Sequence, residues 1–218
     1  AAIIIILFGL YLRHASRTVL MNIINAIKTG DVKRAPRLEA MLSKAIETNK
    51  QRELSYVRQA TIDALTGCKN RRAFDSDIAA LMNDHQPFAL ALVDIDNFKS
   101  INDTWGHLNG DIVLRNVARE GLQVLQPLEI SLYRYGGEEF VVVLPGVSLA
   151  HATAIAERIQ QKIREAGLPH AASAVASEVT VSIGIVASDG TVPIETLIAR
   201  ADSALYQAKN KGRNQWSY

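Results

Sequence analysis

The stretch ISLYRYGGEEFVVVL, residues 130–144, decides the fold of this 218-residue chain. Two apolar runs of strand-like composition flank the pair Gly136-Gly137. Apolar runs on both sides of a glycine pair are typical of a β-hairpin. Glu138 and Glu139 follow the glycine pair directly, so the pattern predicts two adjacent carboxylates at the turn of a buried hairpin.

Regular apolar patterns continue on both sides of this hairpin. A continuous run, FALALV at residues 88–93, is typical of a strand buried on both faces, and strict alternation over residues 179–185 indicates a half-buried strand. Helical spacing covers three segments: residues 98–125, with a glycine-rich interruption at Gly106 and Gly110, residues 152–163, and residues 194–205, which follow Pro193. The order after residue 70, α-β-α-β-β-α-β-α-β, predicts an α+β fold. We expect one mainly antiparallel sheet flanked by helices and preceded by a helical stalk.

The composition excludes several classes of protein. With 48% hydrophobic and 21% charged residues, the chain is neither disordered nor of low complexity. One cysteine, Cys68, excludes a disulfide scaffold and a cysteine-based zinc site. A net charge of +2 gives no support for nucleic-acid binding, so we expect no nucleic-acid partner. P-loop, dinucleotide-binding, zinc-protease and nucleophile-elbow motifs do not occur in the sequence.

The first twelve residues, AAIIIILFGLYL, form an apolar run that is shorter than the roughly 20 residues a helix needs to cross a bilayer. Arg13, His14 and Arg17 follow at once, and positive residues beside a membrane segment favour the cytoplasmic side. We therefore expect residues 1–12 to be the end of a transmembrane helix. The alternative is a buried helix or strand of a soluble domain.

A basic, helical segment separates this run from the rest of the chain. Residues 11–60 carry ten Lys/Arg and four Asp/Glu, a balance of +6, which leaves −4 for residues 61–218. The change in charge predicts a boundary near residue 60. Helical patterns at residues 21–33 and from Pro36 to about residue 62 predict a helical juxtamembrane linker or HAMP-like stalk over residues 13–60. The alternative is one solvated amphipathic helix packed on its own domain.

Carboxylates are grouped where the predicted strands end. Asp94 and Asp96 end one strand in LVDID, and Glu138 follows the glycine pair of the hairpin. If the two strands are neighbours, Asp94 and Glu138 converge at one edge of the sheet, where carboxylates repel unless a cation lies between them. Hard oxygen ligands suit Mg²⁺, so the pattern favours a two-metal site for phosphoryl transfer. The alternative is two solvated acidic turns.

Cationic and polar side chains stand at spacings that suit a nucleotide. Lys99 lies in the first turn of the helix predicted after the acidic strand, where it can face a phosphate together with the helix N-terminus. Lys209 and Arg213 put two more cations about one turn apart. Asn102 and Asp111 offer an amide and a carboxylate, which match the N–H donors and the O6 acceptor of guanine. The alternative for these groups is a solvated helix end.

Five motifs, taken together, resemble those of bacterial diguanylate cyclases, the GGDEF or GGEEF family. The signature is matched by Gly136-Gly137-Glu138-Glu139-Phe140. The other four motifs occur in the family's order. The first is Asp63-Ala64-Leu65-Thr66-Gly67 with Asn70-Arg71-Arg72, and the second is Asp94-Ile95-Asp96-Asn97-Phe98-Lys99, which continues through Ile101-Asn102-Asp103, Gly106-His107 and Gly110-Asp111. The third is Val181-Ser182-Ile183-Gly184, and the fourth runs from Ala201-Asp202 through Gly212-Arg213-Asn214. The match covers about residues 61–218, which are therefore interpreted as a GGDEF-type domain.

The resemblance implies a fold like the palm of class III nucleotidyl cyclases and polymerases. It implies the condensation of two GTP into cyclic di-GMP with release of two pyrophosphates. Two Mg²⁺ or Mn²⁺ per half-site would be held by Asp94, the main-chain carbonyl of Ile95 and Glu138. Glu138 or Glu139 would assist deprotonation of the attacking 3′-hydroxyl, and the sequence leaves that choice open.

The resemblance also implies how GTP is held. The triphosphate would be bound by the main chain of Phe98 and by the side chains of Lys99, Lys209 and Arg213. The guanine would be read by Asn102 and Asp111, with His107 nearby. Asp96 would only brace the strand end, while Arg134 and Asp63 would hold the loop and the linker in place.

Because each nucleotide must be attacked by the other's hydroxyl, two domains must meet as a C2 pair. We expect a homodimer through domain and stalk, membrane attachment through the N-terminal segment, and a catalytic domain on the cytoplasmic side of a bacterial inner membrane. Many relatives carry R-x-x-D before the signature, but residues 126–132 hold neither Arg nor Asp, which predicts weak or absent product inhibition through that site. The alternatives are a catalytically inactive domain that binds GTP or cyclic di-GMP and a purely structural dimerisation module.

Overall fold

The computed structural model describes residues 35–170 and 177–218. The chain divides into two compact units, Ala1–Gln59 and Ala60–Tyr218. In the first, helix α3 (Ala35–Thr61) confirms the helix expected from Pro36 to about residue 62. The predicted membrane segment at residues 1–12 and the first linker helix lie outside the described residues. Among the described helices, none has the length and apolar character needed to cross a membrane.

A six-stranded sheet in the order β1-β3-β4-β2-β5-β6 forms the centre of the second unit. Its strands are β1 (Lys69–Asn70), β2 (Phe88–Ile95), β3 (Ser131–Gly136), β4 (Glu139–Pro145), β5 (Val181–Ser188) and β6 (Trp216–Ser217). The four long strands pair antiparallel, and only the two-residue edge strands β1 and β6 pair parallel. The expected mainly antiparallel sheet is therefore confirmed.

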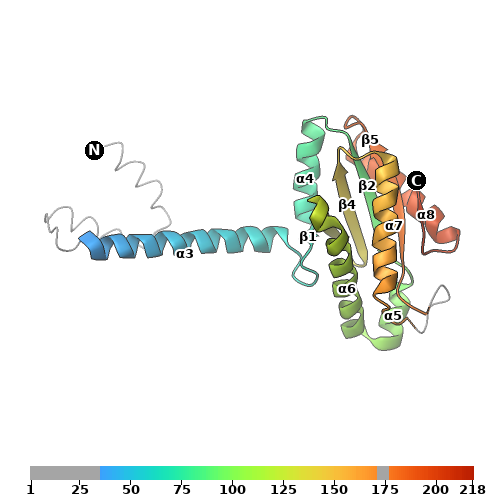
Figure 1. Cartoon of the computed structure of the whole chain (residues 1–218), viewed down its shortest axis with the longest axis horizontal. Helices are drawn as coiled ribbons and strands as arrows, with labels where there is room; N and C mark the ends of the chain where they lie inside the picture. Colours follow the sequence, from blue (N-terminus) through green and yellow to red (C-terminus); the bar gives the residue numbers. More distant parts are fainter. Residues whose placement is uncertain (1–34, 171–176) are drawn as a thin grey trace. The chain divides into compact units, whose positions relative to one another are not determined.

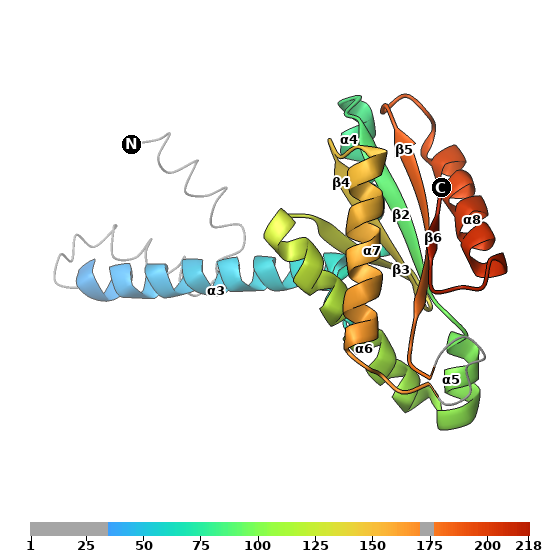
Figure 2. The ribbon, with the colours of Figure 1, turned by 45° about the vertical axis from the view of Figure 1, so that its right-hand side comes forward.

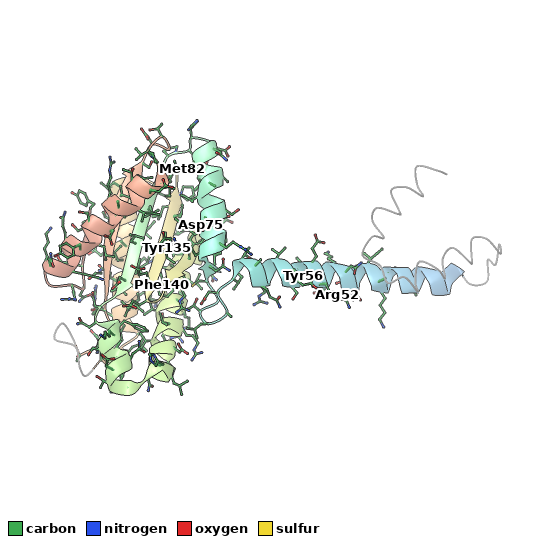
Figure 3. All side chains as sticks on the ribbon, turned by 180° about the vertical axis from the view of Figure 1, so that it is seen from behind. Arg52, Tyr56, Asp75, Met82, Tyr135 and Phe140 are labelled. Carbon is green, nitrogen blue, oxygen red and sulfur yellow. The ribbon has the colours of Figure 1, made fainter. Side chains whose placement is uncertain are left out.

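Helices cover both faces of this sheet (Figure 1). The helices are α4 (Arg71–Asn83), α5 (Phe98–Trp105), α6 (His107–Leu125), the short 3₁₀ helix η3 (Gln126–Leu128), α7 (Leu149–Glu165) and α8 (Ile194–Asn210). Helices α6 and α7 lie on one face, with α8 on the other (Figure 2). Seen from behind, α4 and α8 stand in front of the sheet (Figure 3).

The central strand β2 is buried along its whole length, which explains its continuous apolar sequence. Its odd-numbered residues pack with α5, α6 and α7, whereas Phe88, Leu90 and Leu92 pack with α4 and α8. Because side chains alternate across a strand, Asp94 lies on the α8 face of the sheet. The acidic end of β2 is thereby brought towards the helix that carries Lys209.

Glycine positions correct one expectation about the helical region after β2. The chain breaks at Gly106, whose φ of +80° is a conformation that favours glycine, and this break separates α5 from α6. Gly110, which was expected to interrupt the helix as well, lies inside α6 and is buried. A side chain there would overlap Asn102 of the preceding helix, so Gly110 serves the close approach of α5 and α6 rather than a break.

Candidate active site

The hairpin places two glutamates beside the acidic end of β2. Strands β2 and β4 are neighbours, which is the condition under which Asp94 and Glu138 were expected to converge. The register sets Asp94 opposite Glu139. Gly136 belongs to β3, so the turn consists of Gly137 and Glu138 rather than of the glycine pair. The register of β3 and β4 also shifts near Gly136. Consequently Glu139 is the cross-strand neighbour of Asp94, and Glu138 lies in the turn beside it.

A lysine from α8 reaches this acidic cluster. Lys209 Nζ lies 2.8 Å from Asp94 Oδ1, and the Asp94 side chain is only 9% exposed. Lys209 was expected to face phosphate, and here its ammonium neutralises part of the cluster. Asp94 and Lys209 are 115 residues apart in the chain, so the packing of α8 on β2 and β5 creates this pair.

All three carboxylates have raised pKa values, and burial is the largest cause for each of them. Burial raises the pKa of Asp94, and this effect outweighs the hydrogen bond from Lys209. Partial burial and then repulsion from Asp94 raise the pKa of Glu138 and of Glu139. The charged forms of these carboxylates are therefore less favourable in the folded chain than in water.

A divalent cation fits this cluster by its chemistry. Asp94, Glu138 and Glu139 supply hard oxygen donors, and an ammonium group already lies against one of them. Within residues 35–170 and 177–218, no three His, Cys, Asp or Glu side chains are gathered closely enough to hold a metal ion. The structure thus provides carboxylate oxygen donors for a cation, but not a complete coordination shell.

Arg134 fixes the turn that carries Glu138. Its Nη2 donates to the carbonyl oxygen of Gly137 at 2.9 Å, and its Nη1 donates to Asp63 Oδ1 at 3.1 Å. Thr66 also donates to Asp63 through its amide and its hydroxyl. These contacts confirm the bracing role predicted for Arg134 and Asp63.

The remaining candidate phosphate ligands lie at two element ends. Lys99 is exposed in the first turn of α5, directly after Phe98. Arg213 lies in the turn after α8, and its positive charge acts to lower the pKa of Asp94. The positive charge of Arg213 thus acts on the same carboxylate that Lys209 contacts.

The candidate guanine-reading residues lie where α5 meets α6. Asn102 is partly buried in α5, and its amide lies against Gly110, one residue before the partly buried Asp111. His107 is exposed at the first position of α6. The helices pack on each other, so Asn102 and the start of α6 share one surface.

Asp96 does not join the acidic cluster. Its side chain is buried and accepts hydrogen bonds from Thr180, Ser182 and the main chain of Asn214. The expectation that Asp96 braces the strand end is confirmed. Its partners could not be predicted from the sequence, because they come from segments 84 to 118 residues away.

The class that this fold and site define is an α+β domain with a mainly antiparallel sheet and a carboxylate-bearing hairpin beside its central strand. Residues 60–215 match the family model described as "Diguanylate cyclase, GGDEF domain". The chain belongs to the GGDEF family.

Curated relatives and solved structures agree with this assignment. The chain is 41% identical to the diguanylate cyclase VdcA of Vibrio cholerae and 35% identical to DgcZ of Escherichia coli, each over 72% of this chain. These matches cover 47% of VdcA and 53% of DgcZ, so the chain spans about half the length of these relatives. The crystal structure of the coiled coil and GGDEF domain of DgcB from Caulobacter crescentus, in complex with c-di-GMP, matches with a TM-score of 0.72 at 31% identity, over 84% of this chain and 98% of that one.

Proposed function

We propose that this chain is a diguanylate cyclase, which condenses two GTP into cyclic di-GMP and releases two pyrophosphates. The observation that carries the proposal is the pairing of β2 with β4, which sets Asp94 opposite Glu139 and next to the turn residue Glu138, with Lys209 against Asp94. This constellation occurs in a chain of the GGDEF family whose relatives are named diguanylate cyclases.

Asp94, the main-chain carbonyl of Ile95 and Glu138 would hold the metal. GGDEF cyclases use divalent metal ions in general, and we propose two Mg²⁺ or Mn²⁺ per half-site. When bound, the metal supplies positive charge that stabilises the charge developing on the transferred phosphate. Glu138 or Glu139 assists removal of the proton from the attacking 3′-hydroxyl, and the raised pKa of each carboxylate suits it to accept a proton.

Lys99, Lys209 and Arg213 would bind the triphosphate, together with the main chain at Phe98. Lys209 can exchange its present carboxylate partner for a phosphate once another cation neutralises Asp94. Arg213 offers a planar donor group that matches phosphate geometry. These cations orient the α-phosphate for in-line attack, and positioning of this kind supplies much of the rate enhancement in phosphoryl transfer.

Asn102 and Asp111 would select guanine, with His107 beside them. A carboxylate accepts from the N1–H and N2–H₂ groups of guanine, and an amide satisfies both donors and acceptors. Adenine has no N1–H donor, so Asp111 would be left without a partner. The shared surface of α5 and α6 supports this assignment.

We propose that two copies act together as a homodimer. One half-site holds one GTP, and cyclisation requires each nucleotide to attack the other, so a C2 pair of domains completes the site. The stalk over residues 13–60 would join the two copies. The DgcB structure, which contains a coiled coil and a GGDEF domain, supports a helical stalk ahead of such a domain.

We further propose that residues 1–12 belong to a transmembrane helix of a bacterial inner membrane, with the catalytic domain in the cytoplasm. The apolar run and the basic residues that follow it support this placement. Membrane fractionation, with protease added to spheroplasts and to inverted vesicles, tests it. Recovery of the protein in the soluble fraction would contradict the proposal.

Product inhibition through the R-x-x-D position is proposed to be weak or absent. Leu128 and Ile130 lie there, and they line a cavity of about 510 Å³ with Val124, Val147 and Arg158. Largely apolar walls offer no Arg–Asp pair for a cyclic dinucleotide. Initial rates with added cyclic di-GMP test this point, and submicromolar inhibition that is lost on changing residues 126–132 would contradict it.

The experiment that tests the proposed function incubates the whole chain with GTP and Mg²⁺ and separates the nucleotides by chromatography. We expect cyclic di-GMP at a rate that rises more steeply than linearly with protein concentration. Glu138→Ala should abolish synthesis, whereas Glu157→Ala, an exposed change on α7, should not. GTP binding without product at high protein concentration would favour the inactive receptor, and full turnover by Glu138→Ala would exclude the proposed role of Glu138.

A further inference from the structure

The buried carboxylate of Asp96 joins the end of β2 to two distant segments. Only 2% of Asp96 is exposed. Its Oδ1 accepts from Ser182 Oγ at 2.7 Å, and its Oδ2 accepts from Thr180 Oγ1 at 2.8 Å. Oδ2 also accepts from the backbone N–H of Asn214 at 3.0 Å. Asp96 therefore connects β2, the start of β5 and the turn after α8.

The side chain of Asn214 also accepts a hydrogen bond. Arg164 Nη1, at the end of α7, donates to Asn214 Oδ1 at 2.9 Å. Figure 2 shows that α7 and α8 flank the sheet near the C-terminal strand β6. Asp96 and Arg164 thus hold one residue from two directions, the first through the main chain and the second through the side chain.

The turn that contains Asn214 has an unfavourable backbone conformation. Arg213 and Asn214 have φ values of +64° and +48°, and L-residues other than glycine rarely adopt this region. Such a conformation persists when the surrounding structure holds it in place. Two contacts hold it at Asn214: the backbone N–H of Asn214 donates to Asp96, and Arg164 donates to the Asn214 side chain.

Two cations lie near the acidic end of β2, Lys209 in the last turn of α8 and Arg213 in the turn that follows. Lys209 Nζ lies 2.8 Å from Asp94 Oδ1. Arg213 follows four residues later, and its backbone N–H donates to the carbonyl oxygen of Ala208 at 3.1 Å. The direction of the Arg213 side chain depends on the left-handed backbone conformation, because φ sets how the Cα–Cβ bond points relative to the neighbouring peptide groups.

We propose that Asp96 and Arg164 are positioning residues that fix the phosphate-binding segment, residues 209–214, through Asn214. The proposal rests on the proposed function, since the triphosphate is the anion that Lys209 and Arg213 would bind. Asp96 acts here as a hydrogen-bond acceptor and not as a metal ligand. Both of its oxygens already accept from groups of the protein.

Asp96→Asn separates these two roles. An amide oxygen in place of Oδ2 can still accept from Thr180 and Asn214, and the NH₂ group in place of Oδ1 can donate to the Ser182 hydroxyl. The turn would therefore keep its conformation, although the negative charge is lost. A metal ligand would not tolerate that loss, so Asp94→Asn serves as the comparison.

The experiment uses the whole chain and measures three quantities for each variant: amide hydrogen exchange over residues 211–217, affinity for GTP, and the KM and kcat of cyclic di-GMP synthesis. Arg164→Leu should speed amide exchange in the turn. It should also raise the KM for GTP by roughly tenfold, because one charge-assisted hydrogen bond is lost, and change kcat less. Lys162→Leu is the matched control on α7, because Lys162 pairs with Glu165 of the same helix. Asp96→Asn should resemble the parent, and Asp96→Ala should resemble Arg164→Leu.

Two results would overturn the proposal. One is unchanged exchange and unchanged GTP affinity in Arg164→Leu. The other is a loss of activity in Asp96→Asn as complete as that in Asp94→Asn. If Asp96→Ala does not fold, Arg164→Leu and Asp96→Asn decide the matter. If the parent makes no cyclic di-GMP, the proposed function fails, but exchange and GTP affinity still test the positioning role.

Discussion

Gly110 shows how one missing side chain can shape a binding surface. A Cβ at this position would overlap Asn102 Oδ1 and lie 3.2 Å from Phe98 Cζ. Gly110→Ala should therefore displace the Asn102 amide and weaken GTP binding by roughly tenfold, the cost of one or more misplaced hydrogen bonds. Titration with GTP, with circular dichroism to confirm folding, measures the effect.

A second glycine of α6 provides the control. A Cβ at Gly121 would meet only Leu132 Cδ2, at 3.1 Å, and Leu132 lies in β3 within the core. Gly121→Ala should leave GTP affinity unchanged while it changes stability slightly. Equal affinities in the two variants would show that Asn102 takes no part in nucleotide binding.

Asp63 should give the chain a measurable sensitivity to acid. Burial acts to raise its pKa, but hydrogen bonds from Thr66 and the contact with Arg134 outweigh burial and lower the pKa below 3.8. A carboxylate with a lowered pKa stabilises the folded state above its unfolded pKa, and this contribution is lost as the pH falls through the folded value. Asp63→Asn should cost about 2 kcal/mol at pH 7 and much less near pH 3.

Urea unfolding at several pH values measures this difference. Asp75→Asn, an exposed position on α4, is the control and should track the parent at every pH. A constant difference between Asp63→Asn and the parent from pH 7 to pH 3 would mean that packing, and not the charge of Asp63, is responsible.

At the residue level the sequence predicted the parts of the site that lie in compact motifs. Asp94 and Glu138 were expected to converge if their strands were neighbours, and the pairing of β2 with β4 confirms that the strands are neighbours. Arg164 and Thr180 could not be connected to the site. Their partners are 50 and 84 residues away, and no local period relates such positions.

Among the elements, the contact between β5 and α8 sets the position of Lys209. A Cβ on Gly184 would overlap the backbone of Ala201 and Leu205 in α8 and lie 2.8 Å from Leu205 Cβ. Backbone atoms cannot move aside individually, so α8 would have to shift as a whole. Gly184→Ala should therefore destabilise the chain by about 3 kcal/mol and also lower activity. Urea unfolding measures the first effect and cyclic di-GMP synthesis the second.

Ala187→Val tests whether this effect depends on position. Ala187 lies on the same strand but is exposed, so the larger side chain should change the free energy of unfolding by less than about 0.5 kcal/mol. If Gly184→Ala proves as mild as Ala187→Val, the close approach of α8 to β5 does not limit the fold.

The order and type of the elements followed from hydrophobic period, but their register did not. The hairpin was expected to turn at Gly136-Gly137, whereas Gly136 continues β3 and the turn lies one residue later. The shift of register between β3 and β4 near Arg134 and Gly136 accounts for the difference. Register depends on turn geometry as well as on the hydrophobic pattern, and the glycine pair alone did not reveal the irregularity before the turn.

At the scale of the whole molecule, the acidic cluster should lower stability when no cation is bound. Burial raises the pKa values of Asp94, Glu138 and Glu139, and repulsion from Asp94 adds to the effect at the two glutamates. For a carboxylate with a raised pKa, the relative stabilisation is greatest at low pH and is lost as the pH rises through the folded-state value. The folded chain therefore retains unneutralised charge at neutral pH, which is the condition under which a divalent cation binds best.

Mg²⁺ should consequently raise the melting temperature more at pH 7.5 than at pH 5. At a concentration of 100 Kd the ion would add about 2.7 kcal/mol, or roughly 5–10 °C for a chain of this size. Asp94→Asn should melt higher than the parent without Mg²⁺, because one repelling charge is gone, and should lose the response to Mg²⁺. Glu157→Gln, on the exposed face of α7, is the control and should respond as the parent does. An equal response to Mg²⁺ in Asp94→Asn would show that the ion acts elsewhere and that the carboxylates at the end of β2 are not the metal donors.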